Sequence, residues 1–487
     1  MLCSGVALLT ACDSPQESTI RFGLASAPIN LDPRFATDAA SSRINRLLYE
    51  RLVEFDDHSL PTPGIATWQR LAGEHYRFQL RESLAPFHNG RRVTAHDVVA
   101  TYASILEPAT ASPHRASLAN IRRVVAVDAA TVDFFLREPD LIFPGRLTIG
   151  IMPADLITSH HPFNQQPLGS GAFMFESWPT ASQLTIKRRR DQQRIALVTV
   201  KEPTVRALKL LRGEVDLLQN DLPPELIGYL QEQAGIVVQS RHGSSFAYLG
   251  FNLQDEWVGR HDVRSAIAHA IDRQAIITYL WGGKARLANG LFPPDHWVGS
   301  TTIPQIDYDP NRSRQLLAAL GYTTAQPLKL EYKTSSDPFR IRLATVIQQQ
   351  LHEVGIEVEL KTYDWGTFYG DIKAGRFQMF SLSWVGVKTP DIFHYVFHSA
   401  SAPPVGANRG RYNSPAVDLL IERADRATTL EEQQHDYQAL QRLLGESLPY
   451  VPLWYEDNVV ITRQEVAGYS LSIDGNYDGL LQVKRRY

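Results

Sequence analysis

Alternation of apolar and polar residues along the chain predicts several β-strands. Between positions 76 and 81, the apolar side chains Tyr76, Phe78 and Leu80 fall on one face of an extended segment, and the polar residues fall on the other. Other short segments show a similar pattern between residues typical of turns. These further predicted strands are 131–137, 183–187, 328–333 and 356–361.

A helical period dominates residues 340–354. Its apolar positions recur at three- and four-residue steps and form one stripe, made of Ala344, Ile347, Leu351 and Val354. Gly355 then ends the predicted helix. Because the helix lies between the predicted strands 328–333 and 356–361, this region predicts a strand–helix–strand unit with parallel pairing.

Residues typical of helix ends predict further helices. Asp309 supplies an N-cap and Pro310 a first-turn proline for a helix that Gly321 ends. Asp272 is placed to cap another helix, which runs to Trp281. Together with the strands, these helices predict a mixed α/β fold, and we detect no internal sequence repeat.

Length and charge limit the possible classes of protein. A chain of 487 residues with 44% hydrophobic residues is too long for one compact core and should divide into two or three lobes. A formal net charge of -3 argues against a general nucleic-acid binder. The basic run 187–190 lies beside Asp191 between two strand patterns, so we interpret it as a solvated hairpin tip rather than a site for an anionic partner.

The first residues carry a pattern typical of export. Leu9, Thr10 and Ala11 before Cys12 resemble the lipobox of bacterial lipoproteins, in which the preceding peptide is removed and the cysteine is acylated. The resemblance implies that residues 1–12 are a signal peptide and that Cys12 carries a lipid. No Lys or Arg precedes Cys12 and the apolar stretch is short, so we expect a truncated leader. The alternative is an apolar terminus with an incidental cysteine.

After this leader we expect a soluble body. Cys3 and Cys12 are the two cysteines, so a mature chain beginning at Cys12 has no disulfide and depends on burial for its stability. No apolar run after residue 12 approaches the roughly 20 residues that a bilayer-spanning helix needs. Asp13 resembles the inner-membrane retention signal of enterobacterial lipoproteins.

A series of short motifs resembles one known family in its order along the chain. Phe87, His88 and Gly90 match F-H-x-G, and Ala95 and Asp97 lie within a match to T-A-x-D-V. The matching segments are 48–53, 76–82, 87–90, 94–99, 168–173, 211–216, 262–273, 308–322, 353–356 and 452–454. They resemble the large solute-binding proteins of ABC importers, the peptide, nickel and opine group that includes oligopeptide- and dipeptide-binding proteins (bacterial extracellular solute-binding family 5).

The resemblance implies a periplasmic-binding-protein type II fold with an additional third lobe. Lobe I is expected at residues 19–47, 160–255 and 456–487, lobe II at the insertion 48–159, and lobe III at 256–455. In this family a solute is enclosed as lobes I and III hinge shut. Such closure is a population shift, because the solute must bind the closed form more tightly than the open form.

The resemblance further implies a lipid-anchored, extracytoplasmic component of an ABC importer. It would capture a peptide or peptide-like solute and deliver it to the permease, acting as a monomer without a cofactor. It would lie on the periplasmic face of the inner membrane or, in a Gram-positive host, on the outer face of the cell membrane. Alternatives are a non-peptide solute, such as an oligosaccharide or a metal chelate, and a sensor that feeds no transporter.

One segment is the strongest candidate for contact with the solute. In the peptide-binding relatives, the stretch that matches residues 380–387 runs beside the peptide backbone and pairs with it as an added strand. The resemblance therefore places Ser383, Trp384, Gly386 and Val387 in the site. The alternative is an ordinary buried strand end.

The chain departs from the family at Val387. Peptide binders carry an aspartate there, three residues after the tryptophan, and it pairs with the α-ammonium of the ligand. An ammonium enclosed without that counter-charge would lose about 3–5 kcal/mol. Asp391 could substitute, although Thr389 and Pro390 redirect the backbone before it. The departure favours atypical or blocked peptides, oligosaccharides or another solute.

Other candidate contacts are spread along the chain. Asn30 lies in an early segment that resembles a cleft motif, and Tyr248 and Asn252 lie on a strand expected to end where lobes I and III cross. Arg409 and Arg411 stand near a glycine-rich loop, where either guanidinium could bind a carboxylate or remain exposed to solvent.

Aromatic and histidine side chains offer weaker candidates. Trp281, Trp297 and Trp365 could stack on a ring of the solute, although large aromatic residues more often lie in the core. His394 and His398 stand four residues apart on one face of a predicted helix, a spacing that can hold a metal. Because no third ligand is apparent nearby, we expect no tight metal site.

The sequence offers little support for an enzyme. It contains no His-Glu-x-x-His, Gly-x-Ser-x-Gly or phosphate-loop motif. The paired carboxylates Glu431 and Glu432 lie in a polar helix surface, which is a poor environment for tuned acid–base chemistry. We therefore expect a binding protein, with a surface hydrolase of cell-wall saccharides as the alternative.

Overall fold

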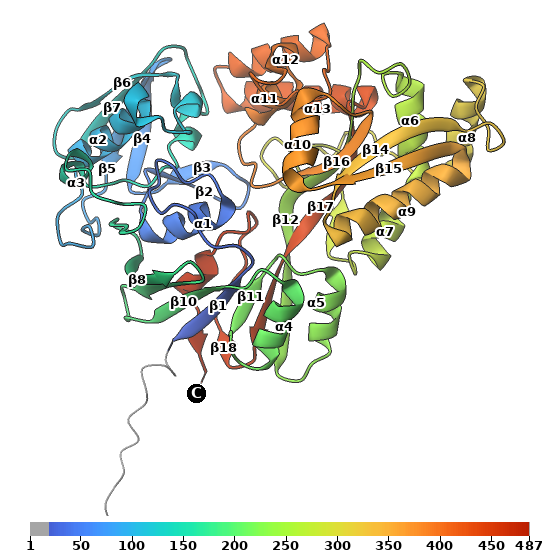
Figure 1. Ribbon diagram of the computed structural model, residues 1–487. Helices are drawn as coiled ribbons and strands as arrows, with labels where there is room; N and C mark the ends of the chain where they lie inside the picture. Colours follow the sequence, from blue (N-terminus) through green and yellow to red (C-terminus); the bar gives the residue numbers. More distant parts are fainter. Residues whose placement is uncertain (1–18, 487) are drawn as a thin grey trace, which may run out of the picture.

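The computed structural model describes residues 19–486. Within these residues, a sheet of eleven strands forms the frame of the molecule (Figure 1). Its order is β15-β14-β16-β12-β17-β11-β1-β10-β9-β8, with β13 paired to β17. The strands are β1 (Ile20–Leu24), β8 (Phe173–Thr180), β9 (Gln183–Arg188), β10 (Arg194–Thr199), β11 (Leu217–Gln219), β12 (Ile236–Phe251), β13 (Ala285–Leu287), β14 (Leu328–Ser335), β15 (Ile356–Tyr363), β16 (Met379–Trp384) and β17 (Tyr450–Arg463).

Strands β12 and β17 join the two halves of this sheet. They pair antiparallel along nearly their whole length, and Figure 1 shows them running from the lower body into the upper right part. Their register shifts between Arg241 and Ser245, and again between Ala247 and Tyr248. Such β-bulges bend and twist a strand. The connection between the halves is therefore continuous but curved.

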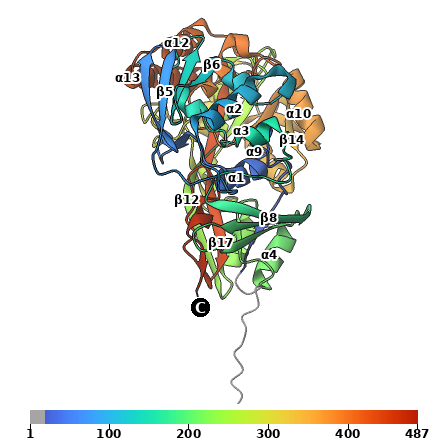
Figure 2. The same ribbon diagram turned by 90° about the vertical axis from the view of Figure 1, so that its left-hand side faces the viewer.

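A second sheet is antiparallel and has the order β4-β5-β7-β6 within the described residues. Helix α2 packs against β6 and β7, and Figure 1 shows this sheet to the left of the large one. Figure 2 turns this side, with α2, β5 and β6, toward the viewer. The short pairs β2–β3 and β18–β19 complete the strands. Their bounds are β2 (Val53–Phe55), β3 (Pro61–Pro63), β4 (Ala66–Ala72), β5 (His75–Leu80), β6 (Ile121–Ala126), β7 (Thr131–Leu136), β18 (Val466–Ala467) and β19 (Lys484–Arg485).

The helices pack on the faces and ends of these sheets. They are α1 (Ala39–Leu48), α2 (Ala95–Leu106), α3 (Ala154–Thr158), α4 (Pro203–Leu211), α5 (Pro224–Gln231), α6 (His261–Ala270), α7 (Arg273–Tyr279), α8 (Pro310–Ala319), α9 (Pro338–Val354), α10 (Trp365–Ala374), α11 (Ile392–Phe397), α12 (Pro415–Asp425) and α13 (Leu430–Ser447). In residues 19–486, none of them has both the length and the apolar character that crossing a bilayer requires.

The predicted strands and the strand–helix–strand unit are confirmed. Tyr76, Phe78 and Leu80 are buried on one face of β5. Strands β14 and β15 pair in parallel, with Leu328 opposite Ile356, and α9 connects them. The buried stripe of α9 includes the four predicted positions and Leu343.

The predicted helix ends are also confirmed, with one difference. The carboxylate of Asp309 accepts the backbone N–H of Arg312 at 2.9 Å, which caps α8. The carboxylate of Asp272 accepts the N–H of Ala275 at 2.8 Å, which caps α7. Helix α7 ends at Tyr279 rather than at Trp281.

Strand β12 is covered on both faces in its second half. Phe246 and Tyr248 belong to one hydrophobic cluster, whereas Ala247 and Leu249 belong to another. Because successive side chains of a strand point to opposite faces, these two clusters lie on opposite sides of the sheet. A separate cluster fills the second sheet and its helix, within residues 52–151. The lobe boundaries given above remain a prediction.

The interpretation of residues 187–190 as a solvated tip is wrong for Arg188. A β9–β10 hairpin forms there, but Arg188 is only 3% exposed. Its Nη1 donates to the carbonyl oxygens of Leu480 at 2.8 Å and Val483 at 2.9 Å. Its Nε and Nη2 donate to the carboxylate of Asp191 at 2.9 and 2.8 Å. Arg188 therefore ties the hairpin to the C-terminal segment.

We expect Arg188→Ala to lower the free energy of unfolding by about 3 kcal/mol, because it leaves buried carbonyl groups without a donor. Arg190→Ala is the matched control, since Arg190 is half-exposed and should change stability by less than about 0.5 kcal/mol. Urea unfolding followed by tryptophan fluorescence measures both. Equal stability of the two variants would contradict the anchoring role of Arg188.

Candidate functional site

The strand order directs attention to one edge of the large sheet as the candidate site. Strand β14 lies between β15 and β16 and is parallel to both, so the carboxyl ends of all three strands meet at the same edge. The chain leaves β14 through α9 to β15, and then returns through α10 to β16 on the other side of β14. Ligands bind α/β sheets at such a change of direction.

A cavity of about 220 Å³ lies at this edge. The ends of β14 and β16 contribute hydroxyl groups from Ser335, Ser381 and Ser383, whereas its remaining lining is mainly apolar. Trp365 and Val385, which are 59% and 60% exposed, also line it. An apolar cavity with a few polar groups suits an amphipathic organic solute.

An ion pair joins this cavity to the crossing strands. Arg340, from the first turns of α9, lines the cavity, and its Nη1 and Nη2 each lie 3.1 Å from Oε1 of Glu456 on β17. Ser383 Oγ donates to the same oxygen at 3.2 Å. The charge of Glu456 raises the pKa of Arg340. The two charges neutralise each other beside the cavity. Neither residue was predicted from the sequence, because no motif marks them.

The structure brings together three of the predicted residues, Tyr248, Trp384 and Arg409. The Arg409 guanidinium lies 4.7 Å from the ring centroid of Trp384 and donates to the hydroxyl groups of Tyr248 at 3.2 Å and Tyr369 at 3.0 Å. Tyr248 is fully buried and stacks on Tyr450 with centroids 4.1 Å apart, and burial raises its pKa. Tyr248 therefore packs with Trp384 in the aromatic cluster and does not line the cavity.

Arg409 is a buried cation held mainly by aromatic groups. It is 6% exposed, and among residues 19–486 no carboxylate lies within ion-pair distance of it. Tyr369 lies on its other side, with the guanidinium 5.3 Å from the ring centroid, and Tyr369 in turn stacks on Trp365. This arrangement connects the buried core to the exposed rim of the cavity.

Asn252 and Arg411 lie away from this group. Strand β12 is antiparallel to β16, with Phe251 opposite Met379, so Asn252 follows the end of β12 that is remote from Trp384. Strand β12 ends at Phe251, just before Asn252, and the placement of this strand end at a lobe crossing remains a prediction. Arg411 lies beside Gly375, whose carbonyl oxygen accepts from Asn252 Nδ2 at 3.4 Å.

The loop after β16, residues 385–391, carries three of the predicted residues. Gly386 has a φ of 70°, a conformation that glycine adopts without strain. Val387 is half-buried against the aromatic cluster. The carboxylate of Asp391 pairs with Nη1 of Arg146 at 2.8 Å, so it is already engaged by the chain.

Asn30 belongs to a local turn before α1. Its side-chain oxygen accepts the N–H of Asp32 at 2.9 Å, and its own N–H donates to Ser41 Oγ at 3.0 Å. Both contacts organise the turn. Asn30 does not line the cavity at the β14–β16 edge, whereas the neighbouring Ile29 is strongly exposed.

The remaining aromatic and histidine candidates have distinct surroundings. Trp281 packs edge-on against Phe339 and Trp454, so its ring belongs to the core. His394 and His398 stack at 4.4 Å, and a hydrogen bond to the carboxylate of Asp425 raises the pKa of His394. In the described part of the chain, no three His, Cys, Asp or Glu side chains form a group that could hold a metal.

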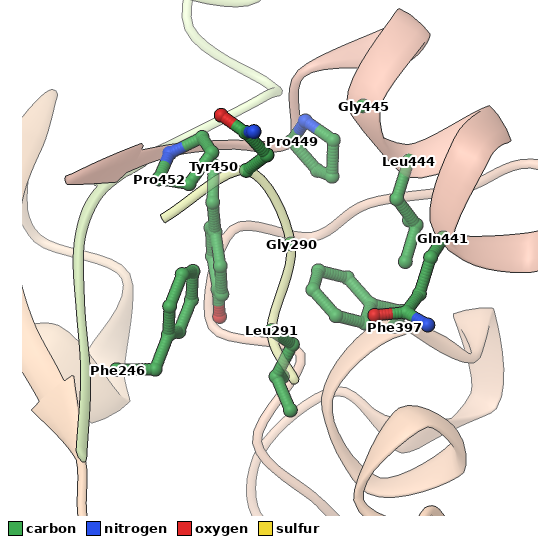
Figure 3. Close-up of a pocket in the computed structure, with 11 residues that line it drawn as sticks. Phe246, Gly290, Leu291, Phe397, Gln441, Leu444, Gly445, Pro449, Tyr450 and Pro452 are labelled. Carbon is green, nitrogen blue, oxygen red and sulfur yellow. The ribbon is translucent and has the colours of Figure 1, made fainter. Parts of the chain in front are cut away.

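A second cavity lies on the opposite, aromatic side of the sheet. Figure 3 shows Phe246, Leu291 and Tyr450 around it, with Gln441 at one side. Its volume is about 30 Å³, which suits a water molecule rather than a solute. The Gln441 side-chain oxygen is buried without a hydrogen-bond donor from residues 19–486, and a water here would supply one.

Comparisons with known proteins agree with the predicted family. A family model described as "Bacterial extracellular solute-binding proteins, family 5 Middle" matches residues 61–403. The chain is similar to Di/tripeptide-binding protein 1 of Pseudomonas aeruginosa (strain UCBPP-PA14), with 26% identity covering 96% of this chain and 94% of the relative.

Two solved structures show the same fold. One is the ABC transporter substrate-binding protein CtaP from Listeria monocytogenes, with a TM-score of 0.86 and 21% identity, covering 96% of this chain and 99% of the other. The second is NikZ from Campylobacter jejuni in complex with Ni(L-His), with a TM-score of 0.81, 22% identity and the same coverage.

We expect Arg409→Met to lower the free energy of unfolding by about 2 kcal/mol, because it leaves the Tyr248 and Tyr369 hydroxyl groups without their donor. The matched control is Arg411→Met, whose guanidinium makes no hydrogen bond within residues 19–486 and whose loss should cost less than about 0.5 kcal/mol. Urea unfolding measures stability, and near-ultraviolet circular dichroism reports the environment of Trp384. If Arg409→Met left both signals unchanged, the supporting role of Arg409 would be refuted.

Proposed function

Because this chain belongs to the bacterial extracellular solute-binding proteins of family 5, we propose that it captures a peptide or peptide-like solute and delivers it to an ABC permease. The expected mixed α/β, type II periplasmic-binding fold is confirmed by the solved relatives. The relatives are solute-binding proteins rather than enzymes, which supports a binding role.

Free backbone groups beside the cavity are the observation that carries the proposal. Strand β16 leaves the sheet after Trp384, and the N–H groups of Val385, Gly386 and Val387 donate no hydrogen bond within residues 19–486. Val385 and Gly386 are also exposed. An extended peptide could satisfy these groups by adding a strand, while the adjacent cavity accepts a side chain.

The charges near this strand end favour a peptide without a free α-amino group. Position 387 is a valine, the next residue is Lys388, and Asp391 is paired with Arg146. A ligand ammonium placed there would lack a counter-charge. A metal chelate is the second candidate, because the similar NikZ structure holds Ni(L-His).

The proposed lobes give this site its way of closing. We place lobe I at residues 19–47, 160–255 and 456–487, lobe II at 48–159 and lobe III at 256–455. The boundary between residues 455 and 456 falls within β17, beside the β-bulge of β12 between Arg241 and Ser245, and the hinge would lie there. Movement there would bring lobe I toward the cavity, and the closed monomer would dock on the permease.

We expect the purified protein to bind N-acetylated peptides more tightly than peptides with a free amino group, as measured by calorimetry. Native mass spectrometry on protein purified from its own host should detect a bound solute. Val387→Asp should raise the affinity for free-amine peptides roughly 10- to 100-fold, because a charged hydrogen bond contributes about 1.5–3 kcal/mol.

Val405→Asp is the matched control, since it adds the same charge at a position that is 78% exposed and outside the loop. It should leave peptide affinities unchanged. No gain for Val387→Asp across a peptide library would favour a non-peptide solute. Catalytic turnover of any bound solute would contradict the proposed function altogether.

The proposed lipid anchor depends on Cys12, which lies outside the described residues. We expect Cys12→Ala, or treatment of the host with globomycin, to move the protein from the membrane fraction to the soluble fraction, because acylation of this thiol would be its membrane attachment. Cys3→Ala is the control and should leave partitioning unchanged. Unchanged partitioning of Cys12→Ala would refute the anchor.

A further inference from the structure

The loop of residues 385–391 also connects the proposed lobes. Its Asp391 pairs with Arg146 of the proposed lobe II, and its Lys388 forms an ion pair with Asp474 of the proposed lobe I. The Lys388 ammonium lies 5.0 Å from the ring centroid of Phe55, on β2. The ammonium of Lys388 therefore contacts residues of the other two proposed lobes.

The carboxylate of Asp474 is oriented to receive a cation. Its Oδ1 accepts from Ser472 Oγ at 2.5 Å and from the Asn476 N–H at 3.1 Å, and its Oδ2 accepts from Asn476 Nδ2 at 2.5 Å. Its side chain is only 10% exposed. Burial raises the pKa of Asp474, but the Lys388 ammonium and these hydrogen bonds outweigh it and hold the pKa well below its ordinary value.

Two other cations lie near Asp474. Arg46 lies within electrostatic range of Asp474, but its nitrogens bind Glu54 and Asp478, each at 2.7 Å. Arg43 lies beside Gly475, with its guanidinium 5.5 Å from the ring centroid of Tyr477, and it forms no ion pair within residues 19–486. Among the three, Lys388 is therefore the cation paired with Asp474. A carboxylate and an aromatic face are together the groups that recognise a primary ammonium.

The backbone of Lys388 is held in place within its own lobe. The Nε2–H of His296 donates to the Lys388 carbonyl oxygen at 2.8 Å, while His296 Nδ1 accepts the N–H of Val298 at 3.2 Å. His296 is itself buried and stacks on Phe292. The loop thus presents its ammonium from a fixed backbone position.

We propose that Asp474 and Phe55 form a receptor for a primary ammonium, which Lys388 occupies as a tethered ligand that holds the lobes together. This inference rests on the proposed function, because it assumes that the lobes open and close. Occupation by Lys388 also denies the receptor to an amino group of the solute. The contact of Lys388 with Asp474 and Phe55 then stabilises the closed form in part, and the contacts of a bound solute stabilise it further.

The test removes the tether and supplies a free ammonium. We expect Lys388→Ala in the full-length protein to lower the ratio of closed to open molecules on the order of 100-fold, as for a buried pair that loses one member. The radius of gyration from X-ray scattering should increase. Adding n-propylammonium, which replaces the deleted atoms, should restore the smaller radius in a saturable manner.

The controls separate the receptor from general effects. n-Propylammonium should not change the radius of gyration of the wild-type protein, whose receptor is occupied. It should also not change the radius of Lys388→Ala/Asp474→Asn, which lacks the carboxylate. Lys329→Ala is the matched control, since Lys329 pairs with Glu357 on an exposed surface of one sheet, and it should keep the wild-type radius. If Lys388→Ala does not fold, Lys388→Met should show the larger radius without rescue, because its side chain fills the space.

The inference would be overturned if both Lys388 variants had the wild-type radius of gyration. It would also be overturned if n-propanol restored the radius of Lys388→Ala, or if n-propylammonium restored the radius of Lys388→Ala/Asp474→Asn. The outcome does not depend on knowing the solute. Rescue by n-propylammonium without any detectable solute binding would therefore refute the proposed function and support the receptor. Solute binding without rescue would refute the receptor and leave the proposed function intact.

Discussion

The antiparallel pairing of β12 with β17 is the constraint on which the rest of the structure depends. Both strands belong to the two halves of the large sheet, so the halves share one ladder of backbone hydrogen bonds, which is interrupted at two β-bulges. Relative movement of the halves is therefore limited to bending and twisting of this pair, and the β-bulge between Arg241 and Ser245 is the place where such deformation is easiest. Glu456, which pairs with the cavity-lining Arg340, lies opposite Ser245 at this point.

The charges around the cavity are largely neutralised by partners within the chain. Arg340 is paired with Glu456, and the two charged residues of the 385–391 loop are paired with the proposed lobes I and II. A charged solute would have to replace one of these pairs with contacts of equal quality, since a charge that loses its partner in a buried site is strongly unfavourable. The site therefore favours recognition through backbone hydrogen bonds and apolar contact.

Local sequence patterns predicted the helices and strands, whereas the arrangement of the site depends on contacts between residues far apart in the chain. The caps at Asp272 and Asp309 were predictable because they involve residues three positions apart. Arg188 was misjudged because its carbonyl partners lie nearly 300 residues later in the chain. The full length of β12 was not predicted because the first half of this strand is polar and lacks alternation. The pair of Arg340 and Glu456 joins α9 to β17, and no local pattern marks it.

The two sides of the proposed cleft differ in stiffness, and this difference limits how a solute can drive closure. On one side, Arg409 and the buried Tyr248 hold Trp384 in the aromatic cluster, so the end of β16 is in place before a solute arrives and little entropy is lost there on binding. Contacts with this strand end are available in both the open and the closed form, and therefore cannot favour closure. Contacts that favour the closed form over the open form must come from groups that reach the solute only when the lobes close. With Asp474 occupied by Lys388, this role falls to residues at the strand crossing, where Glu456 keeps one carboxylate oxygen without a hydrogen bond from residues 19–486.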